Sequence, residues 1–300
     1  MAVPCALSTE NVKRIFSKSP MQKTLMKSVS ISGIGLFSGA KSTLTVHPAP
    51  FDTGIIFERV DLPERSVIPA TLDFVVSTPR CTILGEKKFS ISTVEHLLAA
   101  LKASGIDNAW IELEGPEVPI LDGSSLPFME LFESAGVTSL DKEKKYYHLK
   151  APVFWSEGDV HMIALPSEEY RISYTLHYPN SQILRSQYFS GEINTKIFKN
   201  EIAPARTFCL HHEIAPFVEK GLIKGGSLEN AVIIKDDVVM NPEGFRFPDE
   251  PVRHKVLDLI GDLSLVPLSF YAHIIAIRSG HASNVAFGKE LLNQIKMENP

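Results

Sequence analysis

Hydrophobic and polar residues alternate in short stretches near the start of the chain, and this pattern predicts β-strands. Alternation runs through 29–32 and 42–46, and a third apolar stretch covers 55–57. Successive side chains of a strand point to opposite faces, so the alternation indicates strands with one buried face. Apolar stretches at 82–84 and 88–91 predict a β-hairpin around Gly85.

The spacing of the apolar residues then changes from that of a strand to that of a helix. A mostly apolar segment covers 93–103 and ends before Gly105, and glycine is the residue type favoured just beyond a helix C-terminus. A strand is predicted at 109–113. A second helix is predicted at 127–134, again followed by a glycine.

A charged cluster, KEKK at 142–145, separates this half of the chain from the next, and we interpret it as a linker between domains. Beyond it the pattern starts again. Strands are predicted at 146–154, 161–165, 170–177, 231–235 and 271–277, and helices at 195–201, 213–220, 251–265 and 283–296. Although no sequence repeat is detectable, both halves run from strands to helix, strand and helix. We therefore predict an α+β protein with two similar domains, 21–141 and 146–300, each a β-sheet with packed helices.

The predicted helix 251–265 has an unusual polar face. Residues four apart lie close together on a helix, so His254, Asp258 and Asp262 form one stripe, with Gly261 beside it. An imidazole and a carboxylate at this spacing can bind one metal ion, and glycine lets another group approach the backbone. A solvated polar face with a lone histidine explains the same pattern. Metal binding therefore requires a third ligand from elsewhere in the chain.

The composition is that of an ordinary globular protein. Of 300 residues, 44% are hydrophobic and 22% are charged, and the formal net charge is −5. This charge argues against nucleic acid as a partner, and no apolar run reaches the roughly 18 residues of a transmembrane span. Three widely separated cysteines suggest neither a disulfide framework nor a cysteine zinc site, which favours a reducing compartment, the cytoplasm. Residues 1–20 lack the apolar core of a secretory signal and are interpreted as a disordered tail, with an organelle-targeting peptide as the alternative.

The first predicted helix supplies two more candidates. His96 precedes an almost unbroken apolar run, which indicates a buried imidazole, either a metal ligand or a core histidine bonded to a carbonyl. Glu95 stands next to it, as the catalytic glutamate of zincins stands next to a histidine ligand. Ser92 and Glu95 also match a capping box, in which the glutamate binds the amide of the N-cap residue. Both interpretations of Glu95 stay open on this pattern alone.

A third histidine stands at a junction between predicted elements. His281 follows the predicted strand 271–277 and the turn residue Gly280. Junctions of this kind often carry functional side chains. A histidine in such a place also occurs as a capping or surface residue, and the local sequence does not separate the two.

Five sequence blocks occur in one order: STVEHL at 92–97, ARTF at 205–208, GGS at 225–227, VRHKVLDLIGD at 252–262 and SGH at 279–281. Together they resemble the UDP-3-O-acyl-N-acetylglucosamine deacetylase family (LpxC), the zinc amidohydrolases of lipid A synthesis. The similarity covers about residues 22–296. It implies two domains whose helical layers face each other, with the metal site between the domains.

The resemblance also implies a set of metal ligands. His96, His254 and Asp258 would bind zinc and leave a fourth position for water. Two imidazoles and one carboxylate suit iron(II) as well. The metal-bound water would attack the acetamide of UDP-3-O-acyl-N-acetylglucosamine, a small-molecule substrate, and acetate would be released.

Roles for five further residues follow from the same resemblance. Glu95 would act as the general base, and His281, oriented by Asp262, as the general acid for the leaving amine. The Asp262 carboxylate should raise the pKa of His281. The Thr207 hydroxyl would hold the developing oxyanion, and Lys255 would bind the oxyanion or a substrate phosphate.

The remaining implied contacts concern the nucleotide, the sugar and the acyl chain. Phe208 would lie near the nucleotide and sugar. Apolar residues recur at helical spacing, namely Ile214, Phe217, Val218 and Leu222. The family builds an acyl passage from an insertion at this place, so we expect these residues to line one. Packing of this helix on its own domain is the alternative.

Two other functions remain compatible with the residues themselves. One is a related amidohydrolase that acts on a different amide. The other is a non-catalytic protein that uses zinc for stability, with Glu95 only capping its helix. The sequence does not establish an oligomeric state, for which we expect a monomer.

Overall fold

The computed structural model describes residues 20–86 and 89–299. Residues 1–19 of the predicted tail and Lys88 of the predicted hairpin lie outside the described residues. The first half of the chain contains β1 (Met21–Leu25), β2 (Val29–Ile34), β3 (Lys41–Pro48), β4 (Ile55–Arg59), β5 (Ser66–Pro69), η1 (Leu72–Phe74), β6 (Val75–Ser77), β7 (Ile83–Glu86), β8 (Phe89–Ile91), α2 (Glu95–Ala103), β9 (Ala109–Glu114), α3 (Leu126–Ala135) and β10 (Val137–Glu143).

The second half again begins with strands and ends with a helix. Its elements are β11 (Tyr146–His148), β12 (Val153–Glu157), β13 (Val160–Leu165), β14 (Arg171–Tyr178), β15 (Arg185–Glu192), α4 (Thr195–Ile197), η2 (Phe198–Ile202), β16 (Phe208–Leu210), α5 (His211–Glu219), β17 (Val232–Lys235), β18 (Val238–Val239), α6 (Glu250–Leu263), β19 (Ser269–Tyr271), β20 (His273–Ile277) and α7 (His281–Glu298).

Each half builds one five-stranded sheet, and the two sheets have the same strand order. The first runs β2-β3-β9-β4-β5 and the second β12-β13-β20-β14-β15. In each sheet the strand that comes last in the sequence enters the middle, antiparallel to one neighbour and parallel to the other. This shared topology confirms the predicted α+β class with two similar parts.

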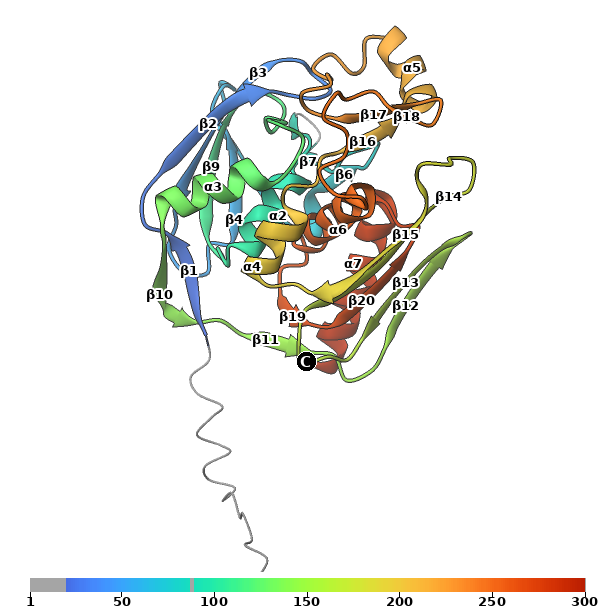
Figure 1. Cartoon of the computed structure of the whole chain (residues 1–300). Helices are drawn as coiled ribbons and strands as arrows, with labels where there is room; N and C mark the ends of the chain where they lie inside the picture. The colour runs from blue at the N-terminus through green and yellow to red at the C-terminus, as the bar shows by residue number, and fades with distance from the viewer. Residues whose placement is uncertain (1–19, 87–88, 300) are drawn as a thin grey trace, which may run out of the picture.

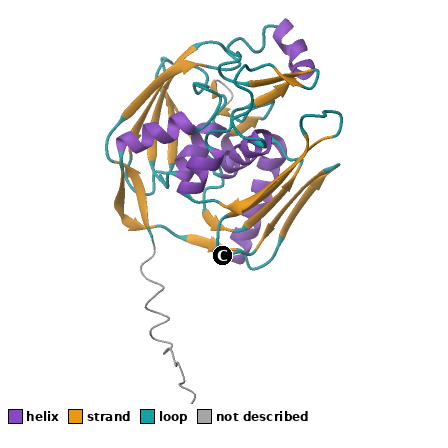
Figure 2. Ribbon diagram, viewed as in Figure 1, coloured by secondary structure: helices purple, strands orange, loops and turns teal. Residues whose placement is uncertain are grey.

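The longer helices lie between the two five-stranded sheets, as Figures 1 and 2 show. A single cluster of buried apolar residues extends through both halves. Helix α6 lies within this layer, and only Arg253 and Lys255 among its 14 residues escape full burial. The polar stripe of this helix is therefore buried, and its interpretation as a solvated surface face is wrong.

Gly261 explains how closely α2 and α6 approach each other. A Cβ atom on this residue would lie 2.1 Å from the carbonyl oxygen of Glu95, at the start of α2. Any larger residue would push the two helices apart. The group that approaches the glycine backbone is thus the first turn of α2.

Several predicted elements differ from those observed. Gly85 lies inside β7, opposite Ser90 of β8, and is not the turn of the hairpin. The single strand predicted at 146–154 is two strands in different sheets, because β11 pairs with β19 and β12 with β13. Strand β15 was not predicted; it is an edge strand whose polar sequence carries little apolar alternation. The charged cluster at 142–145 is not wholly a linker, since Lys142 and Glu143 belong to β10.

The strands β16, β17 and β18 form a small sheet that carries α5 at one edge of the molecule (Figure 1). A small apolar cluster of its own lies beneath it. Among the described residues, every helix is too short or too polar to cross a membrane.

Candidate metal centre and catalytic residues

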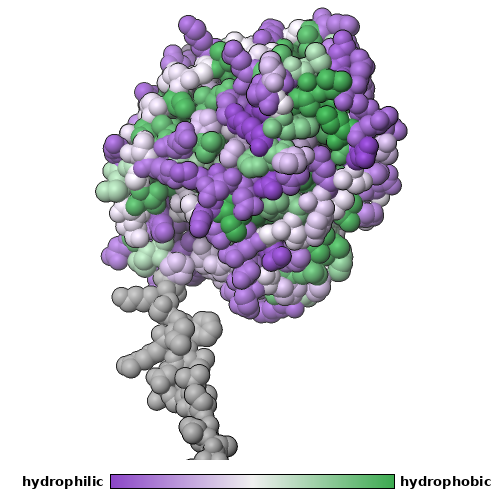
Figure 3. All heavy atoms as spheres, viewed as in Figure 1, coloured by the Kyte–Doolittle hydropathy of each residue, from purple (hydrophilic) through white to green (hydrophobic). Residues whose placement is uncertain are grey.

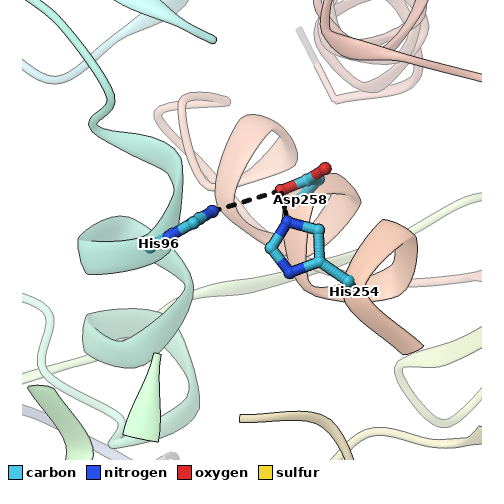
Figure 4. A group of neighbouring side chains, drawn as sticks. All are labelled: His96, His254 and Asp258. Atoms are coloured by element: carbon cyan, nitrogen blue, oxygen red, sulfur yellow. Dashed lines mark ion pairs between the residues drawn. The ribbon is translucent and has the colours of Figure 1, made fainter. Parts of the chain in front are cut away.

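Three buried side chains from the two halves of the chain meet between α2 and α6. His96 comes from the first turn of α2, and His254 and Asp258 lie one turn apart on α6 (Figure 4). The Oδ1 atom of Asp258 lies 3.6 Å from Nε2 of His96 and 3.3 Å from Nε2 of His254. One nitrogen or oxygen atom of each residue lies within 4.8 Å of those of the other two, as a shared metal ion would require.

The hydrogen bonding of His254 defines which nitrogen carries its proton. Nδ1 lies 3.0 Å from the carbonyl oxygen of Ala205, and a carbonyl can only accept, so Nδ1 carries the proton. Nε2 therefore presents a lone pair to Oδ1 of Asp258, a buried oxygen that accepts no hydrogen bond from the described residues. Two such lone pairs repel unless a proton or a cation lies between them.

A proton is disfavoured in this position. Burial lowers the pKa of His254 to about 3. Burial works to raise the pKa of Asp258, but the neighbouring His254 and Lys255 outweigh it and hold that pKa well below its usual range. Neutral imidazoles and an ionised carboxylate are the forms that bind a divalent cation, so the residues present fit a metal ion.

Lys255 binds the other oxygen of the Asp258 carboxylate. Its Nζ donates to Oδ2 over 2.8 Å, which leaves Oδ1 for a cation. The pKa of Lys255 is raised: burial opposes the charge, but Asp258 outweighs burial. The amine also lies 5.8 Å from the centre of the Phe208 ring, which meets the His254 ring edge-on at 6.4 Å. The predicted substrate contacts Lys255 and Phe208 thus adjoin the candidate metal ligands Asp258 and His254.

Glu95 does not cap its helix. Helix α2 begins at Glu95 itself, and the residue before it, Val94, makes no side-chain capping bond. The Ser92 amide donates instead to the carbonyl of Pro116, at 3.1 Å. Glu95 Oε2 accepts a hydrogen bond from the backbone amide of Thr82 at 3.0 Å. The capping-box interpretation is therefore wrong, and the carboxylate faces the centre between the two halves.

Glu95, His281, Asp262 and Thr82 form a closed ring of polar contacts. His281 Nδ1 lies 2.9 Å from Oδ2 of Asp262, and its Nε2 lies 4.0 Å from Oε1 of Glu95. The Thr82 hydroxyl donates to the other Asp262 oxygen at 2.5 Å, while its amide binds Glu95. Burial lowers the pKa of His281, but the charge of Asp262 outweighs burial and raises that pKa to about 9. The raised pKa of His281 agrees with the direction predicted from the sequence.

Two members of this arrangement have no signature in the sequence. Thr82 acts partly through its backbone amide, which every residue except proline possesses. Asn284 of α7 donates from Nδ2 to Oδ2 of Asp262 at 2.9 Å, and its position relative to Asp262 depends on the packing of α6 and α7. No pattern in the sequence indicated either residue.

The block ARTF at 205–208 leads into the strand β16 and contacts the start of α6 through Arg206. Arg206 is 2% exposed, and its backbone amide and Nε both bind Glu250 in the first turn of α6, each at 2.9 Å. This places the Ala205 carbonyl on His254, and Thr207, two residues further on, is half-buried. The backbone amide of Thr207 donates to the Gly123 carbonyl and its carbonyl accepts from the Val232 amide, each at 2.8 Å.

A cavity of about 590 Å³ opens next to Lys255. Its lining includes Tyr174 and Tyr178. Six further titratable or cationic residues line it as well, and these are His177, His212, Arg278, Glu213, Asp236 and Asp237. It is therefore a polar cavity that reaches the candidate centre through Lys255.

The predicted acyl-binding residues lie on α5 and just after it. Phe217, Val218 and Leu222 are 37%, 51% and 52% exposed, while Ile214 is half-buried. Figure 3 shows hydrophobic residues gathered on this side of the molecule, near the elements that Figure 1 labels α5, β17 and β18. Packing on the domain core does not account for the three exposed side chains.

Comparison with known proteins gives one consistent result. The family model described as LpxC, UDP-3-O-acyl N-acetylglycosamine deacetylase, matches residues 22–293. A protein of Chlamydia pneumoniae named UDP-3-O-acyl-N-acetylglucosamine deacetylase is 48% identical over 277 residues, which is 92% of this chain and 98% of that protein. One of the same name from Chlamydia trachomatis serovar D is 46% identical over 277 residues, 92% of this chain and 96% of that protein. The chain belongs to the UDP-3-O-acyl-N-acetylglucosamine deacetylase family.

Proposed function

We propose that this chain hydrolyses the acetamide of UDP-3-O-acyl-N-acetylglucosamine and releases acetate, as a step of lipid A biosynthesis. One observation carries the proposal: a buried His96–His254–Asp258 cluster lies beside two titratable groups, Glu95 and His281, whose nearest atoms are 4.0 Å apart. The names of the relatives support the choice of substrate.

We propose zinc as the metal. Two imidazoles and one carboxylate are a ligand set of catalytic zinc sites, and iron(II) is bound by the same set. When bound, the ion would polarise the carbonyl of the acetamide and lower the pKa of a coordinated water. The protein's own residues supply the remaining chemistry.

Glu95 acts as the general base in this proposal. Its pKa is raised by burial, although His281 and His96 work against that effect. A carboxylate with a raised pKa is a stronger base, because it gains more by accepting a proton. The Thr82 amide binds one of its oxygens and leaves the other, Oε1, directed at His281 and the space between them.

His281 acts as the general acid. With a pKa of about 9 it is protonated near neutral pH, and its Nδ1 proton is held by Asp262. The free Nε2 proton faces the same space as Glu95. One residue can thus take a proton from the attacking water while the other gives one to the leaving amine.

The remaining site residues would hold the substrate. In this proposal the Thr207 hydroxyl and the Lys255 ammonium stabilise negative charge on the carbonyl oxygen. We assign the diphosphate end of the substrate to the polar cavity beside Lys255, where Lys255 and Arg278 would bind it, with Phe208 against the sugar.

The acyl chain requires an apolar surface of its own. We propose that it lies along the apolar residues of α5 and the segment after it, Ile214, Phe217, Val218 and Leu222. Binding a hydrocarbon chain here would remove exposed apolar area from water, at roughly 25 cal/mol per Å².

We further propose a cytoplasmic monomer with two domains, divided between residues 141 and 146. The two sheets of equal topology support the division. Cys81 and Cys209 are both free thiols, which suits a reducing compartment.

The test is acetate release from UDP-3-O-acyl-N-acetylglucosamine by the purified protein, with and without a chelator. We expect activity that the chelator removes and that added zinc restores. Glu95→Gln should keep the fold and the bound metal and reduce kcat by about 10²-fold or more. An active, metal-free enzyme would exclude the metal mechanism. Activity on simple acetamides but not on the UDP-sugar would indicate a different amidohydrolase, and folded, zinc-bound but inactive protein a structural metal site.

A further inference from the structure

A second cavity of about 590 Å³ lies between the two halves of the chain, apart from the metal cluster. Its wall includes Lys102, in the last turn of α2, and Ser264, the residue that ends α6. His96 is in the first turn of α2, and six residues of helix separate it from Lys102 by about 9 Å along the axis. The two helices that carry the metal ligands therefore have their C-terminal ends at this cavity.

One part of the lining of this cavity is apolar. It is formed by aliphatic side chains from both halves of the chain, and these are Ile55, Ile56, Leu98, Leu101, Ile106, Val266 and Leu268. A wall of this kind favours a hydrocarbon or ring surface over water.

Lys102 brings a cation into these apolar surroundings. Its Nζ lies 5.9 Å from the centre of the Phe270 ring, and it forms neither a hydrogen bond nor an ion pair within the described residues. Burial lowers the pKa of Lys102 to about 8. The nearest carboxylate, Asp107, is already bound by the amine of Lys144. A bound anion would stabilise the charged form of a lysine that lacks a partner in an apolar wall.

The mouth of the cavity adds further positive charge. Lys142, Lys144 and Lys145 line it together with Lys102, against three acidic residues. Asp52 pairs with Lys142 and Asp107 with Lys144. Lys102, Lys145 and the third acid, Glu143, form no ion pair with a described residue, so two unpaired lysines face one unpaired carboxylate and the lining keeps an excess of positive charge.

We propose that this cavity is a second binding site, for an amphiphilic anion: an apolar body against the aliphatic wall and a carboxylate or phosphate on Lys102. The ligand would bridge the two halves where α2 and α6 end. Its source is either a fatty-acid-like carboxylate or an alkyl phosphate, and both present the same chemistry to the site.

The experiment measures binding of octanoate and of octyl phosphate to the full chain by isothermal titration calorimetry at pH 7. We expect saturable binding of one equivalent of at least one of them, and none of octanol or inorganic phosphate at the same concentrations. Lys102→Met should weaken binding at least tenfold. Lys289→Met, which removes an exposed lysine of α7, should leave binding unchanged.

A second pair of variants separates this cavity from the candidate active site, which could itself bind an amphiphile. Lys255→Met should leave the affinity unchanged, whereas Ser269→Asp, which adds negative charge to the cavity wall, should weaken it. Ser269→Asp also tests the proposal should Lys102→Met fail to fold. Binding that is abolished by Lys255→Met and unaffected by Lys102→Met would overturn the proposal. So would equal binding of octanol, or no saturable binding of either anion.

Discussion

Replacing Asp262 by asparagine tests the acid role of His281 directly. Asparagine has nearly the same shape and still offers an oxygen to the Nδ1 proton of His281, but it removes the negative charge. That charge is the main effect that raises the pKa of His281 against burial. In the variant, burial is left to lower the pKa, and we expect it to fall to the usual value of 6.5 or below.

The magnitude follows from the two pKa values. A change from about 9 to 6.5 is 2.5 units, or about 3 kcal/mol of lost stabilisation of the imidazolium. At pH 8 the protonated fraction of His281 would fall from about 0.9 to about 0.03. We therefore expect kcat at that pH to fall about 30-fold through protonation alone.

The assay is the pH dependence of kcat for both proteins, loaded with the same metal. The descending limb should lie about 2.5 pH units lower in Asp262→Asn than in the parent protein. A bound dication lowers the pKa of His281 in both proteins, so the difference between them is the quantity to compare. A descending limb that keeps its position in the variant would refute the assignment of His281 as the acid held charged by Asp262.

Stability gives a second readout with a defined sign. The pKa of His281 is raised in the folded protein, so protonation of this residue stabilises the fold. This contribution to the unfolding free energy is fully present below pH 6.5 and is lost as the pH rises through about 9. Between pH 6 and pH 9.5 the parent protein should lose up to about 3 kcal/mol more unfolding free energy than Asp262→Asn. Urea unfolding at the two pH values measures this difference.

Three further predictions concern other parts of the centre. His96→Ala should lose bound metal by elemental analysis, whereas His281→Ala should keep it and lose only activity; metal loss in the second variant would make His281 a ligand. Thr82→Val removes the hydroxyl bond to the Asp262 carboxylate and should lower kcat about tenfold, with Thr82→Ser near the parent; equal rates for the two would show that the hydroxyl is unimportant. Gly261→Ala places a Cβ atom 2.1 Å from the α2 backbone and should cost about 1–3 kcal/mol in unfolding free energy, more than Gly288→Ala, whose nearest contact is 3.3 Å; the reverse order would contradict the close packing of α2 and α6.

The local features of the centre could be predicted from the sequence. The spacing of His254, Asp258 and Asp262 places them on one helical stripe regardless of the rest of the fold. The meeting of His96 with this stripe depends on long-range packing of α2 against α6, which no local pattern encodes. The sequence blocks suggested it only through their resemblance to a family.

The misassigned features have physical causes. The sequence around Ser92 matches a capping box, but Ser92 forms a bridge with Glu117 and Thr93 adopts a φ of +60°, so the helix starts later than the pattern indicates. The carboxylate of Glu95 is then free to bind the Thr82 amide. Strand β15 lies at a sheet edge, where a polar sequence is tolerated on both sides and periodicity is weak.

The equal topology of the two sheets explains where the centre lies. Helix α2 precedes β9, the middle strand of the first sheet, and α6 precedes β20, the middle strand of the second, with the short strand β19 between them. The two helices therefore occupy equivalent positions in the two halves, and they face each other across Gly261. One contributes Glu95 and His96 and the other His254 and Asp258, so neither half contains a complete ligand set. A cation held by residues of both helices would therefore add its binding free energy to the docked state of the two halves.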